Sequence, residues 1–157
     1  MNDLQTQFDL IRTTRQNFQR ILAGFTIEEL NEIPNGFNNN LVWNYAHIIV
    51  TQQILCYKLS NLEPVVNKEL IDNYRKGTKP ENFVTAEGFD HLKTISISAI
   101  DQLETDYNNG LFKEFKSYQT SYGVELKTIE EAIQFNIAHE AMHLGGIMAL
   151  RKMIGTA

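Results

Sequence analysis

The amino-acid sequence predicts an all-α protein built as a bundle of four long helices. Apolar side chains recur at helical spacing over four long segments, and typical capping or breaking residues stand at the borders of these segments. Convincing strand patterns are scarce, and four long helices with little strand are typical of a four-helix bundle. The 157 residues suit one domain over 1–157, with no internal repeat, low-complexity tract or linker.

The first predicted helix covers residues 3–23 and carries one apolar stripe. This stripe consists of Leu4, Phe8, Ile11, Phe18, Ile21 and Leu22. Gly24 marks the end of the helix. Thr26 followed by Glu29 matches a capping box and begins a short helix, which must end before Pro34 because proline restricts the residue in front of it.

The second long helix is expected over residues 41–60. It follows an Asn-rich loop at 38–40, and an asparagine there can cap the helix through its side-chain oxygen. A long polar connection then runs from residue 61 to 84. A short helix over 67–76, ended by Gly77, is expected within it.

The third helix is expected over residues 86–107, with Thr85 as its cap and the Asn-Asn-Gly sequence at 108–110 as its end. Residues 111–126 are rich in Phe, Tyr and Ser, and we expect a short extended or hairpin segment there. Another capping box opens the fourth helix, which is expected over 128–154.

Composition argues against several classes of partner. The formal net charge is −5, and the 14 Lys and Arg residues are scattered, so no basic face for duplex nucleic acid or an anionic membrane is visible. No apolar run reaches the roughly 20 residues of a spanning helix. Cys56 is the one cysteine, and the first residues lack the apolar stretch of a secretory signal. We therefore expect a cytoplasmic protein with neither nucleic acid nor membrane as partner.

The strongest motif for chemistry lies in the last helix, where His139 and His143 are four residues apart. Side chains at this spacing differ by about 40° around the helix axis and about 6 Å along it, so both imidazoles can reach one ion. Their apolar neighbours at helical spacing are Phe135, Met142, Ile147 and Leu150, which predicts that the pair points inward. Burying two imidazoles is costly unless each finds a partner, and a metal ion supplies one.

His47, in the middle of the second helix, is the expected third ligand. Its neighbours at helical spacing are Trp43, Thr51 and Ile54, so it too is predicted to face inward. Catalytic zinc sites commonly use three protein ligands and keep one position open. His91 lies between Asp90 and Lys93 near a helix start and is expected at the surface. Cys56 is expected to be a small core residue.

Residues 139–143 also match the short H-E-x-x-H pattern of zinc peptidases. Only 14 residues follow His143, and none of them is His, Asp or Glu, so a third ligand cannot follow downstream. The sequence therefore disfavours a peptidase. Glu140 keeps two interpretations: a catalytic base that assists a metal-bound water, or a solvated acid on the helix face.

Two further features near the histidines have alternative interpretations. Gly145 and Gly146 each cost about 1 kcal/mol relative to alanine inside a helix. Close approach of a neighbouring helix is the favoured reason, and space for a ligand beside the metal is the alternative. Asn44, three residues before His47, could orient a substrate or a bound water.

The sequence resembles the DinB-like superfamily, which also takes in the YfiT-like metal-dependent hydrolases. The resemblance covers essentially the whole chain and is carried by residues 40–47, by 122–126 and by 128–151, with all three histidines in place. It implies an up-down-down-up order of helices, a homodimer in many members, and nickel, zinc or another divalent ion on the three histidines. Characterised relatives include thiol-dependent transferases and isomerases, and hydrolases.

Three functions remain open at this point. The first is an enzyme that acts on a small-molecule substrate, with His47, His139 and His143 as metal ligands and Glu140 as base. Its reaction would be hydrolysis, or transfer onto a low-molecular-weight thiol. The second is a non-enzymatic metal- or ligand-binding bundle. The third has no metal at all, the histidines being hydrogen-bonded within the core.

Overall fold

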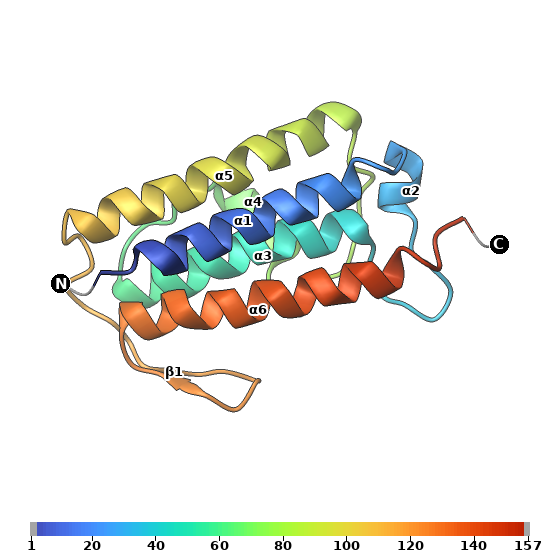
Figure 1. The fold of residues 1–157 in the computed structure, drawn as a ribbon. Coiled ribbons are helices and arrows are strands. Elements are labelled where there is room, and N and C mark those ends of the chain that lie inside the picture. Colours follow the sequence, from blue (N-terminus) through green and yellow to red (C-terminus); the bar gives the residue numbers. More distant parts are fainter. Residues whose placement is uncertain (1–2, 156–157) are drawn as a thin grey trace.

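Four long helices dominate the computed structural model, which describes residues 3–155. They are α1 (Gln5–Leu22), α3 (Leu41–Cys56), α5 (Ala86–Asn108) and α6 (Ile129–Leu150). They lie side by side (Figure 1), with α6 packed on both α1 and α3, and α5 packed on the same two helices. The all-α class is therefore confirmed. The two residues at each end of the expected domain, 1–2 and 156–157, lie outside the described residues.

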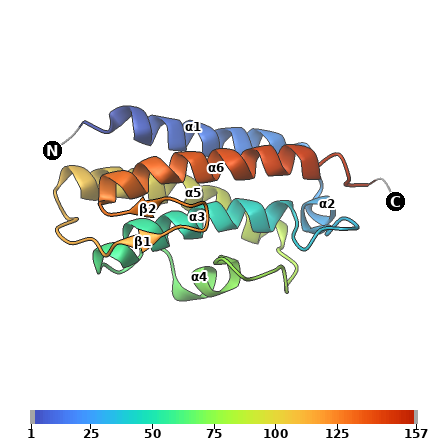
Figure 2. The same cartoon turned by 90° about the horizontal axis from the view of Figure 1, so that it is seen from below.

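Short elements connect the long helices. They are α2 (Ile27–Asn31), the 3-10 turn η1 (Lys58–Ser60), α4 (Lys68–Tyr74), and the strands β1 (Tyr118–Gln119) and β2 (Glu125–Leu126). The two strands form an antiparallel hairpin, as expected for the segment 111–126. Figure 2 shows this hairpin along α3 and α6, with α4 on the outer side of α3.

Two long helices end earlier than the sequence predicted. The second stops at Cys56 and not at residue 60, because the chain tightens into η1 and then turns at Asn61, which has a φ of 57°. The last stops at Leu150 and not at residue 154. Beyond it the amides of Lys152 and Met153 bond three residues back, which is the pattern of a tightening helix end.

Side-chain caps fix the helix starts where the sequence placed them. Thr26 and Glu29 form both halves of the capping box at α2. Asn40, Thr85 and Thr128 each accept a hydrogen bond from the backbone three residues on. At α6 the second half of the box differs, because the Glu131 carboxylate accepts from the amide of Lys127.

Helix α3 is the centre of the fold and carries His47. It is buried at every position except Thr51 and Ile54, because α2, α4, α5 and α6 pack against it. The two partly exposed positions lie on the same face as His47, one and two turns along. That face is where the helix can meet a ligand.

The core consists of two apolar clusters with a polar layer between them. One cluster holds Phe18 of α1 and Ile147 of α6, and the other holds Ile11 and Ile133 of the same helices. Four buried polar side chains lie between these positions or close to them: Arg15, Gln52, Ser96 and Glu140. Polar groups this deep need hydrogen-bond partners, and Arg15 donates to the side chains of Glu140 and Gln52 and to the backbone carbonyl oxygen of Ser96.

None of the helices within residues 3–155 combines the length and the apolar character that crossing a bilayer requires.

Candidate metal centre

The packing of α3 against α6 brings the three selected histidines together. His47 comes from α3, and His139 and His143 come from successive turns of α6. One ring nitrogen of each histidine lies within 4.8 Å of the corresponding nitrogens of the other two. The ring centroids are 4.6 to 5.2 Å apart. Three imidazoles from two helices therefore face a common point.

Hydrogen bonds fix the ring of His47. Its Nδ1 lies 2.7 Å from the carbonyl oxygen of Tyr74, and since a carbonyl can only accept, Nδ1 carries the proton. Nε2 then holds the lone pair of the ring, and the Thr51 hydroxyl lies 3.3 Å from it. The Trp43 indole stacks on the imidazole at 4.5 Å. His47 is thus presented as a neutral ring with Nε2 as its donor atom for an ion.

Asn44 fixes the ring of His143 in the same way, through a hydrogen bond at Nδ1. The side-chain NH2 group of Asn44 donates to the carbonyl oxygen of Asn40 and to the side-chain oxygen of Asn39. These two bonds leave Oδ1 of Asn44 directed toward His143. Oδ1 accepts from Nδ1 of His143 at 2.9 Å, leaving Nε2 of this ring with a free lone pair. The sequence pointed to Asn44 as a positioning residue, but for a substrate or water and not for His143.

The ring of His139 is partly buried beside Phe135, and its buried Nδ1 finds no hydrogen-bond partner among the described residues. Burial lowers the pKa of His139 to about 3, and the two neighbouring histidines add to the shift. Burial also lowers the pKa of His143 to about 4 and lowers that of His47. All three imidazoles are therefore neutral at pH 7, the form that binds a metal.

These observations fit a divalent ion. Neutral imidazole is a good ligand for zinc, nickel and similar ions, and two of the three rings have their tautomer set by an oxygen on the far side. The third ring carries an unpartnered nitrogen. Hydrogen bonding within the core explains two histidines, but it leaves His139 unsatisfied.

A cavity of about 110 Å³ opens beside the centre. Its walls come from α3 with His47 and Thr51, from α6 with Phe135 and His139, from the hairpin, and from Lys76 after α4. The long connection over 61–84 therefore covers part of the site. Lys76 and the hairpin residues could not be predicted as part of the site, because no sequence motif connects them to the histidines.

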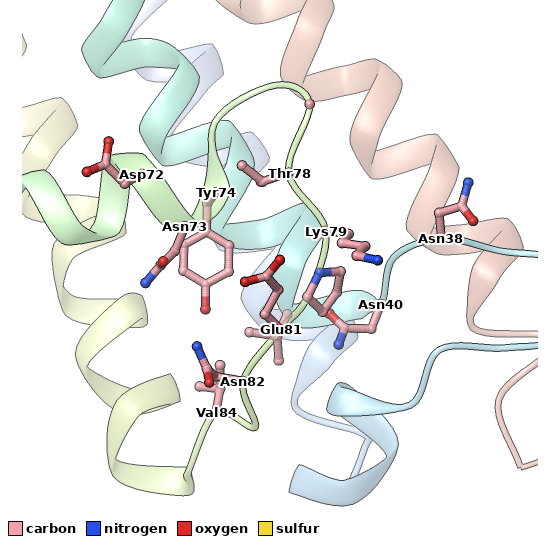
Figure 3. A pocket seen from close by; sticks show the side chains of 13 residues that line it. Asn38, Asn40, Asp72, Asn73, Tyr74, Thr78, Lys79, Glu81, Asn82 and Val84 are labelled. Atoms are coloured by element: carbon pink, nitrogen blue, oxygen red, sulfur yellow. The ribbon is translucent and has the colours of Figure 1, made fainter.

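A second and larger cavity, of about 500 Å³, lies between the start of α3, the end of α4 and residues 77–84 (Figure 3). Its walls combine apolar residues such as Val42 and Val84 with polar ones such as Asn73 and Glu81. None of the three histidines lines it. The smaller cavity is therefore the one that can serve a metal centre.

Glu140 lies in the polar layer, paired with Arg15. The guanidinium donates to both carboxylate oxygens at 2.8 to 3.3 Å, and both side chains are fully buried. The interpretation of Glu140 as a solvated acid is therefore wrong. Burial raises the pKa of this carboxyl group, while Arg15 opposes the shift. Arg15 was missed, although it stands at an apolar position of its stripe between Ile11 and Phe18.

The glycines of α6 do not allow close approach of a neighbouring helix within the chain, which was the interpretation favoured from the sequence. A Cβ added at Gly145 or Gly146 would meet no heavy atom within 4 Å, so no helix of residues 3–155 approaches them closely. Neither glycine lines the cavity beside the centre. Met142 was expected to face inward but is 52% exposed. This face of α6 is turned to the outside.

Two expectations about residues outside the centre are confirmed. His91 is exposed on α5. Cys56 is fully buried, and its sulfur accepts a hydrogen bond from Asn136. Burial raises the pKa of this thiol, which keeps it protonated and unreactive.

Replacing Asn44 by alanine is expected to weaken zinc binding about 10–100-fold, because Nδ1 of His143 loses the acceptor that orients the ring. A competition titration with a chromogenic chelator measures this. Asn39→Ala is the matched control, since it removes a partner of Asn44 that does not touch His143. Equal weakening in both variants would contradict the assigned role of Asn44.

Comparisons with known proteins were made for the whole chain. A family model described as the DinB superfamily matches residues 10–147, a range that includes all three histidines. A crystal structure of the conserved protein of locus from Enterococcus faecalis has a similar fold, with a TM-score of 0.68 over 98% of each chain. The two sequences are 14% identical, so this similarity concerns the fold alone. A comparison with curated proteins found no match.

Proposed function

The chain belongs to the DinB superfamily, and on this premise we propose that it is a metal-dependent enzyme with one divalent ion on His47, His139 and His143. The observation that carries the proposal is the convergence of three neutral imidazoles from α3 and α6, two of them oriented by hydrogen bonds at Nδ1. The reaction is hydrolysis of a small molecule, or transfer onto a low-molecular-weight thiol.

The chemistry divides between the ion and the chain. A divalent ion on three nitrogens acts as a Lewis acid and lowers the pKa of a water or thiol that it binds. The protein residues orient the histidine rings and enclose the site. Tyr74 and Asn44 hold two of the rings, and Phe135 provides an apolar wall beside the third. Thr51 places a hydroxyl within hydrogen-bond distance of the centre.

Glu140 is not assigned the role of base. Arg15 occupies both of its oxygens, and no hydrogen bond links its carboxylate to a histidine within residues 3–155. We propose instead that Glu140 fixes α6 against α1.

The finer description of the fold belongs to the same proposal. We assign an up-down-down-up four-helix bundle within one domain. The colour order in Figures 1 and 2 supports it, since α1 and α6 advance toward the end where the C-terminus lies, while α3 and α5 run back. A cytoplasmic location is also proposed, from the single cysteine.

Metal content tests the proposal. Protein purified without an affinity tag should contain about one ion per chain by elemental mass spectrometry, as expected for a single site with three protein ligands. Cobalt-loaded protein should change its visible spectrum when azide is added, which reports an exchangeable position. No uptake of zinc, nickel or cobalt would contradict the proposal. Uptake without any response to azide would instead favour a non-enzymatic metal-binding bundle.

We also propose that the chain forms a homodimer through the outer face of α6. From residue 134 to residue 150 the exposed residues of α6 lack charge, whereas a solvated helix face is normally rich in charged residues. They include Ala138, Ala141, Met142, Gly145 and Met148. The open space above Gly145 allows another backbone to come close. Contact with a second copy of the chain would remove this uncharged face from water.

Gly145→Arg is expected to convert a dimer of this kind into a monomer, because a long charged side chain would separate the two helices. Light scattering after size-exclusion chromatography measures the mass. Ser98→Arg, on the exposed side of α5, is the matched control and should leave the mass unchanged. A wild-type protein that is monomeric at every concentration would contradict the proposed dimer.

A further inference from the structure

The cavity beside the histidines has an unusual charge for this chain. The chain carries a formal net charge of −5, yet no Asp or Glu of the described part of the chain lines this cavity. Among residues 3–155, Lys76 is the one Lys or Arg side chain in its wall. The larger cavity differs, because Asp72 and Glu81 line it along with Lys79. The smaller cavity is therefore the positive one, and a bound divalent ion adds to that charge.

Lys76 is available to a ligand. Lys68, Lys93 and Lys127 each pair with a nearby carboxylate. Lys76 forms no ion pair with any residue between 3 and 155. An exposed ammonium group at the wall of an acid-free cavity attracts an anion.

The segment that carries Lys76 is fixed to the centre on both sides. Before it, the carbonyl oxygen of Tyr74 accepts a hydrogen bond from His47. After it, the Thr78 hydroxyl accepts from the indole of Trp43 at 3.1 Å, and this indole stacks on His47. Lys76 therefore lies in a segment whose backbone is held beside His47 on both sides.

The remaining walls determine the rest of the ligand. Ile54, Leu55 and Phe135 of α3 and α6 contribute apolar surface, and the hairpin segment adds the hydroxyl groups of its lining residues, Tyr118, Thr120 and Ser121. The volume of about 110 Å³ restricts the enclosed part to a small body. An anionic group at one end and a short apolar body at the other fit this arrangement.

We propose that the cavity takes a small organic anion with a short apolar body, and that Lys76 binds its charged group. This rests on the proposed function, because it names the substrate class of the same centre. Lys76 is a specificity residue here, and the ion and histidines carry the chemistry.

Benzoate, benzamide and benzylamine test this as probes of equal shape and different charge. Calorimetric titration of zinc-loaded protein should show benzoate binding about 10-fold more tightly than benzamide, with no binding of benzylamine. Lys76→Gln should remove most of that preference and leave benzamide unchanged. Lys79→Gln removes the same charge three residues away, beside the other cavity, and should retain the preference.

Repeating the titrations on metal-free protein separates this inference from the proposed function. A preference for benzoate that depends on Lys76 should persist without the ion, in weaker form. A protein that takes up no metal yet shows this preference would contradict the proposed function alone. Metal uptake with equal affinity for benzoate and benzamide, or with a Lys76→Gln variant that behaves as wild type, would overturn the role of Lys76.

Discussion

Replacing Glu140 by glutamine should lower the free energy of unfolding by about 3–5 kcal/mol. The substitution keeps the shape of the side chain but removes the charge that faces Arg15, whose guanidinium is fully buried. An uncompensated charge in the core costs far more than the ion pair itself contributes. Urea unfolding followed by circular dichroism measures the difference.

A double substitution tests whether the lost stability comes from leaving Arg15 without its partner. Arg15→Met combined with Glu140→Leu replaces the pair by apolar groups of similar size, and should recover most of the lost stability. Recovery will be incomplete, because Arg15 also donates to the carbonyl oxygen of Ser96 and to Gln52. A Glu140→Gln variant as stable as wild type but inactive would restore the catalytic base and contradict our assignment.

Alanine at any one of the three histidines should reduce the metal content from about one ion per chain to below about a tenth, since two nitrogens hold an ion poorly. Elemental mass spectrometry of His47→Ala, His139→Ala and His143→Ala measures this. His91→Ala controls for non-specific loss, because His91 is exposed and remote from the cluster. Full metal content after replacing two of the three would place the ion elsewhere and leave the histidines as core residues.

The helices were predictable because their signals are local. The caps at Thr26, Asn40, Thr85 and Thr128 depend on residues within three positions, and the sequence places them correctly. The histidine pair of α6 is local as well. The assignment of His47 needed one further step, the inference that a mid-helix histidine among apolar neighbours faces inward.

Other features depend on packing between distant segments and could not be predicted. Arg15 stands on the apolar stripe of α1, but a charged residue type argues for the surface, and only its ion pair with Glu140, 125 positions along the chain, explains its burial. Asn44 lies 99 positions from His143, the ring that it orients. The favoured interpretation of Gly145 failed for the same reason, since a sequence does not say which helix face has a neighbour.

The buried ion pair also fixes how far α6 can slide along its neighbours. If α6 slipped by one helical turn, about 5.4 Å, Glu140 would leave Arg15 and face apolar side chains. His139 is the residue before Glu140, so the same slip would carry it away from His47 on α3. The register that keeps one charge neutralised is thus the register that aligns the histidines. The pairing of Arg15 with Glu140 thereby sets the geometry of the histidine cluster.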